Sequence, residues 1–343
     1  MGKRKSPHWT KSFQRALDSI AQSTVRVGTH MMKEAVRPVI EKHKKPPGPG
    51  EWITGLALGP TGMRRYYLYR PSGIAVFERL PLLVMLHGCR QDAKTFAHST
   101  RMNQIAARER FFVLYPEQDR LANPQGCWNW FETRSGKAYG EAAILSAAID
   151  QVCLFYPIDR DRIAIAGMSA GASMGALLVT RNPARFKAVV MHSGVAPGTA
   201  HSSASVLGAM LGAKTPAALS AKKSWPPLLV IHGGKDHVVD ARNALASAQV
   251  WAEAAGARAG TVRRVRRGNR HEMMLTDFKV KGSTIATLCE VGELGHAWSG
   301  GHTAHPFGDA EGPDASRMVW AFAARQFEKP AAGRPRSMFW TRF

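Results

Sequence analysis

The sequence predicts one α/β domain built on an open, doubly wound and mostly parallel sheet with helices on both faces. Short, continuous apolar runs recur along the chain, and longer segments with helical periodicity separate most of them. Continuous apolar strands are typical of parallel sheets covered on both faces. Alternating strands and helices are typical of doubly wound folds. The chain has 343 residues, 45% of them hydrophobic, which suits one large domain of this kind plus extensions.

Six apolar runs are the expected strands of the parallel part of the sheet. An earlier strand pair is expected at residues 55–58 and 65–69, and helices are expected at residues 139–154 and 241–255. The six runs are residues 82–86, 111–115, 163–166, 188–191, 228–231 and 284–291.

Segments of different composition flank and interrupt this pattern. Residues 1–50 are expected to be a basic amphipathic segment and a Pro/Gly linker: the first 45 residues hold 11 Lys or Arg against 3 Asp or Glu. The amphipathic pattern predicts a helix in this segment, and such a helix either lies on an anionic surface or packs on its own domain. The main domain is expected over residues 51–329 and a tail over 330–343. Residues 197–226, rich in Ala, Ser and Gly, predict a small lid over the carboxyl edge of the sheet, or else a plain surface excursion.

The charge and the cysteines limit the partners and the compartment. Lys and Arg number 47 against 25 Asp and Glu, a formal net charge of +22 that favours anionic surfaces. No nucleic-acid-binding motif accompanies this charge, so no specific nucleic acid is expected. No apolar run is long enough to span a bilayer, and the basic N-terminus lacks the apolar core of a secretory signal. Four cysteines without metal-ligand spacing predict free thiols in a reducing compartment, with a Cys89–Cys127 bridge if the protein is exported.

Ser169 is the expected nucleophile. A serine hydroxyl needs a base and oxyanion donors to attack a carbonyl. The run at residues 163–166 leads into Gly167, Ser169 and Gly171, and a helix-forming run follows. Strand, Gly-x-Ser-x-Gly and helix together are the signature of a nucleophile elbow. Ser173 and Ser193 are the rivals, and both are expected to be structural.

The acid and the base are expected later in the chain, in the order Ser, Asp, His. Asp236 follows the run at residues 228–231, and Asp240 is its rival, more suited to capping the next helix. His296 follows the last apolar run in a glycine-rich loop, with His302 and His305 as alternatives. His87, His232 and His271 lie away from the expected place.

Two further sets of residues complete the expected site. Cys89 and Ala170 are expected to donate the two backbone N–H groups of an oxyanion hole. Trp128, Trp130, Met168 and Trp298 are expected to contact an apolar substrate. For the aromatic cluster at residues 127–131, the alternative is a hydrophobic plug under the loop.

Five motifs together resemble those of the poly(3-hydroxybutyrate) depolymerase family of esterases, which also contains feruloyl- and acetylxylan-type esterases. The resemblance covers roughly residues 52–327. It implies the α/β-hydrolase fold, a triad of Ser169, Asp236 and His296, and ester hydrolysis through an acyl-enzyme, without metal or organic cofactor. The motifs are LHGCRQ at 86–91, CWNW at 127–130, GMSAGA at 167–172, HGGKD at 232–236 and GHAWSGG at 295–301.

The chain departs from the family pattern in three ways. Ser299 stands where the family usually has proline, a change expected to matter little for the chemistry. Neither a secretion signal nor a separate polymer-binding domain is evident. The last two departures predict a cytoplasmic, granule-associated enzyme, with an extracellular one as the alternative.

Three functions therefore compete. The first is a serine esterase that cleaves polyhydroxyalkanoate or its oligomers, held at an anionic granule or membrane surface by residues 1–50. The second is a feruloyl- or acetylxylan-type esterase. The third is a basic surface-binding protein without activity, which the complete set of Ser169, Asp236 and His296 argues against.

Overall fold

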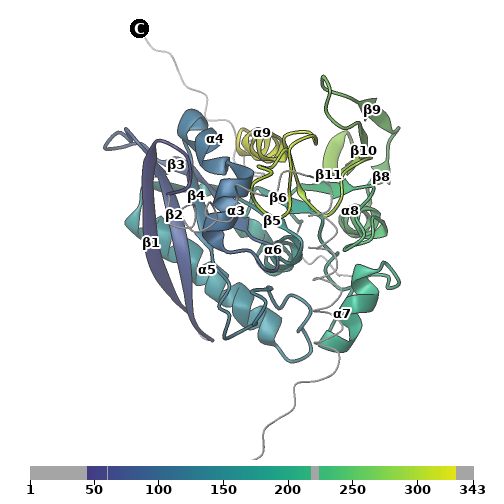
Figure 1. The fold of residues 1–343 in the computed structure, drawn as a ribbon, viewed down its shortest axis with the longest axis horizontal. Coiled ribbons are helices and arrows are strands. Elements are labelled where there is room, and N and C mark those ends of the chain that lie inside the picture. The colour runs from purple at the N-terminus through teal and green to yellow at the C-terminus, as the bar shows by residue number, and fades with distance from the viewer. Residues whose placement is uncertain (1–44, 60, 218–223, 330–343) are drawn as a thin grey trace, which may run out of the picture.

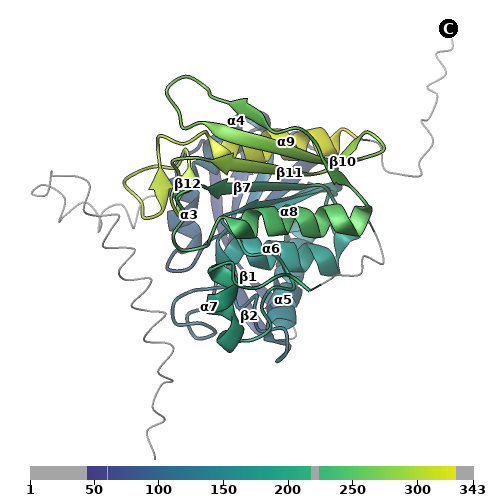
Figure 2. The same ribbon diagram turned by 90° about the vertical axis from the view of Figure 1, so that its right-hand side faces the viewer.

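The structure, a computed structural model, describes residues 45–59, 61–217 and 224–329. Its centre is one twisted sheet with helices on both faces (Figures 1 and 2). The strand order is β1-β2-β4-β3-β5-β6-β7-β11-β10-β8, and β9 also pairs with β10. The strands of this sheet are β1 (Gly50–Gly59), β2 (Gly62–Pro71), β3 (Leu80–Leu86), β4 (Phe112–Pro116), β5 (Ile158–Met168), β6 (Ala188–His192), β7 (Leu228–Gly233), β8 (Arg258–Ala259), β9 (Arg263–Val265), β10 (Met273–Val280) and β11 (Ser283–Val291).

The middle of the sheet is parallel and its edges are antiparallel. Strands β4, β3, β5, β6, β7 and β11 run parallel to their neighbours in this series. The β1–β2 pair and the β8–β10 edge close the sheet in antiparallel register. The doubly wound α/β prediction is therefore confirmed, and each of the six expected runs lies on one of the parallel strands.

Helices cover the sheet in two groups, and each group has its own core. Figure 2 shows α5, α6 and α8 on one side of β7 and β11, and α4 and α9 on the other. Alternate residues of β3 face the two cores: Leu82, Val84 and Leu86 join the first, and Leu83 and Met85 the second. The helices are α3 (Ala93–Thr100), α4 (Met102–Glu109), α5 (Lys137–Phe155), α6 (Ala170–Arg181), α7 (Ser203–Met210), α8 (Arg242–Ala255) and α9 (Ala315–Phe327), with a 3₁₀ turn at Pro183–Arg185.

Judged by length and composition alone, helix α5 is long and apolar enough to cross a membrane. This was not expected, because the sequence analysis found no apolar run long enough to span a bilayer. Half of its most apolar stretch is buried, and it packs against β1, β2 and α6. These contacts make it a core helix of the sheet's first face.

The described elements lie between the two predicted flanking segments. The sheet begins at Gly50, and the last helix ends at Phe327. Within the expected lid, the described residues form α7, whose Val206 and Ala209 are buried and whose Ser203 donates a backbone hydrogen bond to Glu132. The amphipathic helix predicted before residue 45 and the tail predicted from residue 330 lie outside the described residues.

Candidate active site

Ser169 sits on a sharp turn between β5 and α6. Its backbone has φ 54° and ψ −121°, a conformation that non-glycine residues rarely adopt and that marks functional strain. Gly167 and Gly171 permit the turn: a Cβ on Gly167 would lie 2.5 Å from the carbonyl of Gly171, and one on Gly171 would lie 2.3 Å from the oxygen of Leu86. The strand, the strained serine and the two obligatory glycines form a nucleophile elbow.

Asp236 and His296 form a buried pair at the same end of the sheet. Asp236 follows β7, and its Oδ2 lies 2.8 Å from His296 Nδ1. Its other oxygen, Oδ1, accepts the backbone N–H groups of Val238 and Val239, both at 2.9 Å. Burial alone would raise the pKa of Asp236, but the nearby histidines His296 and His232 and these hydrogen bonds hold it at about 2. The carboxylate is therefore ionised at neutral pH and orients the His296 ring.

A glycine allows the two residues to meet. A Cβ on Gly233 would lie 2.1 Å from the oxygen of Leu294, so the end of β7 and the segment before His296 touch through their backbones. Lys235 N–H also donates to Leu294 O at 3.0 Å. The rival Asp240 instead accepts hydrogen bonds from the backbone and side chain of Arg242, while the N-cap of α8 is Ala241, so Asp240 does not cap this helix as was expected.

His192, which the sequence analysis passed over, links the elbow to the loop that carries His296. Its backbone oxygen accepts the Ser169 N–H at 2.8 Å, and its ring Nε2 accepts the Ser299 N–H at 3.1 Å. The ring also stacks on Trp298, with centroids 4.9 Å apart. Burial lowers the pKa of His192 to about 3, so the ring is neutral at pH 7 and Nε2 is free to accept.

The loop that carries His296, residues 292–313, is called the histidine loop below. Ser299 within it was expected to be a neutral departure from the family's proline. Proline has no N–H and cannot make the bond to His192, so this substitution matters for how the loop is held. In the described part of the chain no hydrogen bond joins the Ser169 hydroxyl to His296, and such catalytic contacts are often long before substrate binds.

A second loop, residues 87–91 after β3, approaches Ser169 from the other side and is called the cysteine loop below. A Cβ on Gly88 would lie 3.5 Å from Ser169 Cβ. Ala170 is the first residue of α6, where backbone N–H groups have no acceptor within the helix. Among the described residues, Cys89 N–H likewise has no protein acceptor. The two predicted oxyanion donors are thus unengaged at the positions that flank the elbow.

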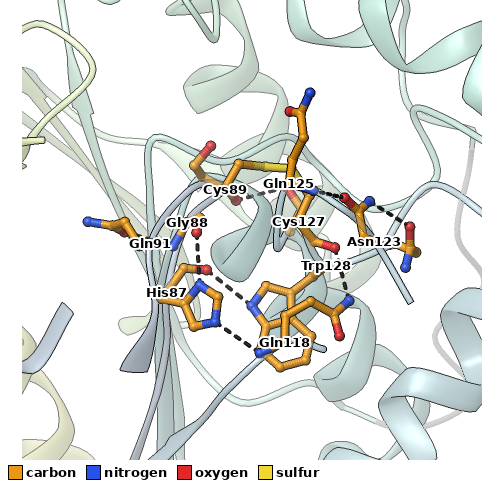
Figure 3. The surroundings of a disulfide bond; sticks show 12 residues. His87, Gly88, Cys89, Gln91, Gln118, Asn123, Gln125, Cys127 and Trp128 are labelled. Atoms are coloured by element: carbon orange, nitrogen blue, oxygen red, sulfur yellow. Dashed lines mark hydrogen bonds between the residues drawn. A yellow bond between two sulfur atoms is a disulfide. The ribbon is translucent and has the colours of Figure 1, made fainter. Parts of the chain in front are cut away.

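A disulfide and a buried histidine fix the cysteine loop (Figure 3). Cys89 is bonded to Cys127, so the expectation of four free thiols is wrong for this pair, while Cys153 and Cys289 are free and buried. His87 Nε2 accepts the Gln118 N–H at 3.1 Å, so its Nδ1 carries the proton and donates to Gly88 O at 2.8 Å. Because the peptide unit is planar, holding the Gly88 carbonyl also fixes the direction of the Cys89 N–H.

The expected substrate-contacting aromatics are core residues instead. Trp128 and Trp298 are 0% and 1% exposed, Met168 is 1% exposed and Trp130 6%. Trp128 Nε1 donates to His87 O and Trp298 Nε1 to Ser316 Oγ, so both indoles serve to support loops. The prediction of a pocket wall made by these four side chains is corrected by their burial. Trp128 and Trp130 lie in one core, as the plug alternative for their loop had it, and Met168 and Trp298 lie in the core on the other face of the sheet.

The remaining sequence candidates have other partners. Ser173 lies inside α6 and accepts the Val195 N–H through its Oγ at 2.8 Å, and Ser193 is wholly buried beside His192. The rings of His302 and His305 are tilted by 60° to each other, with centroids 5.7 Å apart, and the Asp236 carboxylate bonds to His296. No group of three or more His, Cys, Asp or Glu suited to a metal occurs among the described residues.

The chain is similar to several known esterases and depolymerases. A poly(3-hydroxyalkanoate) depolymerase C from Paucimonas lemoignei is 29% identical over 53% of this chain and 46% of its own length. An acetylxylan esterase A from Emericella nidulans is 25% identical over 49% of this chain and 54% of its own. The chain thus spans about half the length of the curated relatives it matches.

Among solved structures, an acetyl xylan esterase from Aspergillus awamori matches with a TM-score of 0.57 and 18% identity, over 73% of this chain and 94% of that one. An S-formylglutathione hydrolase from Staphylococcus aureus matches with a TM-score of 0.51 and 15% identity, over 83% and 99%. These likenesses identify the α/β-hydrolase fold.

A family model described as esterase PHB depolymerase matches residues 64–274, more than half of the chain. The match includes the elbow, the cysteine loop and Asp236. The chain belongs to the PHB depolymerase family of esterases.

Proposed function

We propose that this protein hydrolyses carboxylic esters through an acyl-enzyme on Ser169, and that its substrate is polyhydroxyalkanoate, such as poly(3-hydroxybutyrate), or its oligomers. The observation that carries the chemistry is the buried Asp236–His296 pair at the end of the sheet where the Ser169 elbow projects. A serine on a strained elbow and an imidazole oriented by a carboxylate are the components that activate a hydroxyl for attack on a carbonyl.

The steps follow from the roles that each group can play. His296 takes the proton of the Ser169 hydroxyl as its oxygen attacks the ester carbonyl, and the Cys89 and Ala170 N–H groups stabilise the oxyanion. Asp236, ionised and bonded to Nδ1, stabilises the imidazolium that forms. His296 then protonates the leaving alcohol. Water attacks the acyl-enzyme in the same way and releases the carboxylic acid and free Ser169.

The choice of polyester rests on the family and on the depolymerase relative. Acetylxylan and feruloyl esterases among the relatives favour a second candidate, an esterase that acts on acylated polysaccharide. The burial of Trp128 and Trp130 removes the aromatic face on which either a sugar or an aliphatic chain would have packed, so the choice between the two candidates falls to the substrate panel below.

The test is ester hydrolysis by the wild type and by Ser169→Ala. With p-nitrophenyl butyrate, kcat should fall by about 10⁴-fold or more in the variant, while Ser283→Ala, an exposed serine on β11, should match the wild type. An active Ser169→Ala protein would exclude the mechanism. A panel of amorphous poly(3-hydroxybutyrate), its dimer esters, methyl ferulate and acetylated xylan then identifies the substrate: the highest kcat/KM on the last two would favour the second candidate.

The compartment is a separate proposal. Disulfides persist in oxidising compartments, so the Cys89–Cys127 bond supports export, against the cytoplasmic location that the sequence pattern predicts. Rapid alkylation of thiols in the source cells, followed by mass spectrometry, distinguishes the two. Bridged Cys89 and Cys127 would favour export, and four alkylated cysteines would favour the cytoplasm.

A further inference from the structure

A basic groove lies on the sheet face opposite α6, away from the Ser169 elbow. It runs between α4, α9 and strands β9 to β11, which lie together at the top of Figures 1 and 2. Its volume is about 1050 Å³. Seven arginines and one lysine line it, against two aspartates. This set is called the arginine groove below, and it concentrates on one face a charge that the proposed hydrolysis does not use.

Much of this charge is not neutralised by the protein. The two aspartates are each engaged, Asp277 by Arg263 at 2.9 Å and Asp314 by Arg317 at 3.4 Å. Arg108 pairs with Glu109 at 2.7 Å. Among the described residues, no carboxylate lies within ion-pair distance of the other five groove cations. These are Arg101, Arg267, Arg270, Arg325 and Lys329.

The floor of the groove is apolar. Val265, Leu275 and Met318 are partly exposed there, above the buried side chains of Met273 and Phe322. An apolar floor under an arginine rim fits a ligand with an aliphatic body and an anionic group, because arginine pairs bidentately with a carboxylate.

The shape and the lining argue against other polyanions. Phe322, which is buried, is the only aromatic residue in the described lining, so the groove offers no platform on which nucleic-acid bases would stack. A concave site also fits a flat membrane surface poorly, whereas a single flexible chain can lie along it.

The groove shares a structural element with the candidate active site. Arg101 Nη2 donates to Gly300 O at 2.5 Å, and Arg270 Nη1 donates to Gly312 O at 2.6 Å. Both acceptors belong to the histidine loop, whose start carries His296. The rim of the groove and the catalytic histidine are therefore on the same loop.

We propose that the arginine groove binds aliphatic ester oligomers that end in a carboxylate, the kind of product that hydrolysis of a polyhydroxyalkanoate releases. This inference rests on the proposed function for the identity of the ligand. The carboxylate pairs with the arginines that have no carboxylate partner, and the aliphatic ester chain covers Val265, Leu275 and Met318.

The test measures binding of the linear 3-hydroxybutyrate trimer, as its free acid, to the Ser169→Ala protein. This background prevents turnover, so the result does not depend on activity. The ε-methyl NMR signal of Met318 reports the groove, and that of Met168, directly before Ser169, reports the active site. Met318→Leu assigns the first signal.

The expected result is a shift of the Met318 signal that saturates with the acid. Arg267→Glu combined with Arg325→Glu, both exposed and without a carboxylate partner in the described chain, should weaken this binding about tenfold or more. The matched charge reversal Lys137→Glu with Arg160→Glu, outside the groove, should change it by less than about twofold. The trimer methyl ester should bind more weakly than the acid.

Several outcomes would overturn the proposal. These are equal binding of acid and methyl ester, unchanged affinity in the groove variant, equal binding of inorganic phosphate, and displacement of the trimer by a single-stranded oligonucleotide at lower concentration. If the wild type fails to hydrolyse p-nitrophenyl butyrate while Met318 still responds to the acid, the proposed function fails and the groove's ligand chemistry stands.

Discussion

The cysteine loop and the histidine loop approach the same serine, but different forces hold them. The cysteine loop has a covalent bond to residue 127, and His87 and Gln91 hold the peptide groups on either side of Gly88. The histidine loop is held through His192, Arg101 and Arg270, all by hydrogen bonds. The loop that presents the fixed N–H donors is held covalently, and the loop that presents the base is held by hydrogen bonds alone, one of them to the neutral His192 ring. Removal of the disulfide should therefore affect mainly the cysteine loop, and acid should affect mainly the histidine loop.

The largest expected effect is on the histidine loop's contact with Asp236. Asp236→Asn should lower kcat on p-nitrophenyl butyrate by about 10⁴-fold, because the amide no longer holds the His296 tautomer that accepts the Ser169 proton. Asp240→Asn, at the start of α8, should keep the wild-type rate. A comparable loss in both variants would show that Asp236 has no special role.

The next effect tests the covalent lock of the cysteine loop. Cys89→Ser with Cys127→Ser should lower the free energy of unfolding by about 2–4 kcal/mol, since the bond closes a loop across 38 residues. Urea denaturation with and without a reducing agent measures this. Reductant should bring the wild type to the level of the variant and leave the variant unchanged. A wild type insensitive to reductant would show that the bond does not stabilise the fold.

The third effect is the acid sensitivity of the histidine loop. Burial lowers the pKa of His192 to about 3, against 6.5 for the ordinary side chain. Below pH 6.5 the unfolded chain takes up a proton that the folded His192 refuses, so acid favours unfolding until the pH approaches 3. In this range, each unit by which the pH falls lowers the free energy of unfolding by about 1.4 kcal/mol.

His192→Gln removes this proton uptake and can keep an acceptor for Ser299 N–H. We therefore compare the free energies of unfolding of the wild type and the variant. The excess of the wild type over the variant should fall by about 2 kcal/mol as the pH is lowered from 6.5 to 5. Asp236, with a pKa of about 2, adds stability that is fully present above pH 4 and lost only as the pH falls toward 2, so it does not contribute in this window. Parallel pH curves for the two proteins would contradict this account.

The parallel strands of the fold followed from the sequence, and the antiparallel edge beyond them did not. The parallel strands are continuous apolar runs because both their faces are covered. β10 (Met273–Val280) has alternating burial and includes Asp277 and Lys279, so it lacks the apolar run that indicated the others. β9 consists of Arg263, Arg264 and Val265 and forms only in contact with β10.

At the site, the sequence predicted those residues that lie in short motifs. Gly-x-Ser-x-Gly and the order of Asp236 and His296 placed the elbow and the buried pair. His192 was missed because its contact with Ser299 N–H spans 107 residues of sequence. The tryptophans were misjudged because an aromatic residue on a loop has the same sequence signal whether it faces solvent or supports the loop from below.

The smallest expected effect belongs to the better-held loop. Gln91 Oε1 accepts the Gly88 N–H at 2.9 Å and is buried. Gln91→Met removes this acceptor without adding charge, and kcat on p-nitrophenyl butyrate should fall by less than about tenfold. The loss is small because His87 still holds the Gly88 carbonyl and the disulfide still holds Cys89, so the oxyanion donor keeps its direction.

Combining the change with disulfide removal sharpens the comparison. Gln91→Met should cost more activity in the Cys89→Ser, Cys127→Ser background than in the bridged protein, because the two restraints act on adjacent peptide groups. Gln151→Met, at a partly exposed position on α5 where the amide donates to Leu56 O, provides the control in both backgrounds. If the two losses simply multiply, the disulfide and Gln91 restrain different parts of the loop, and the Cys89 N–H does not depend on both.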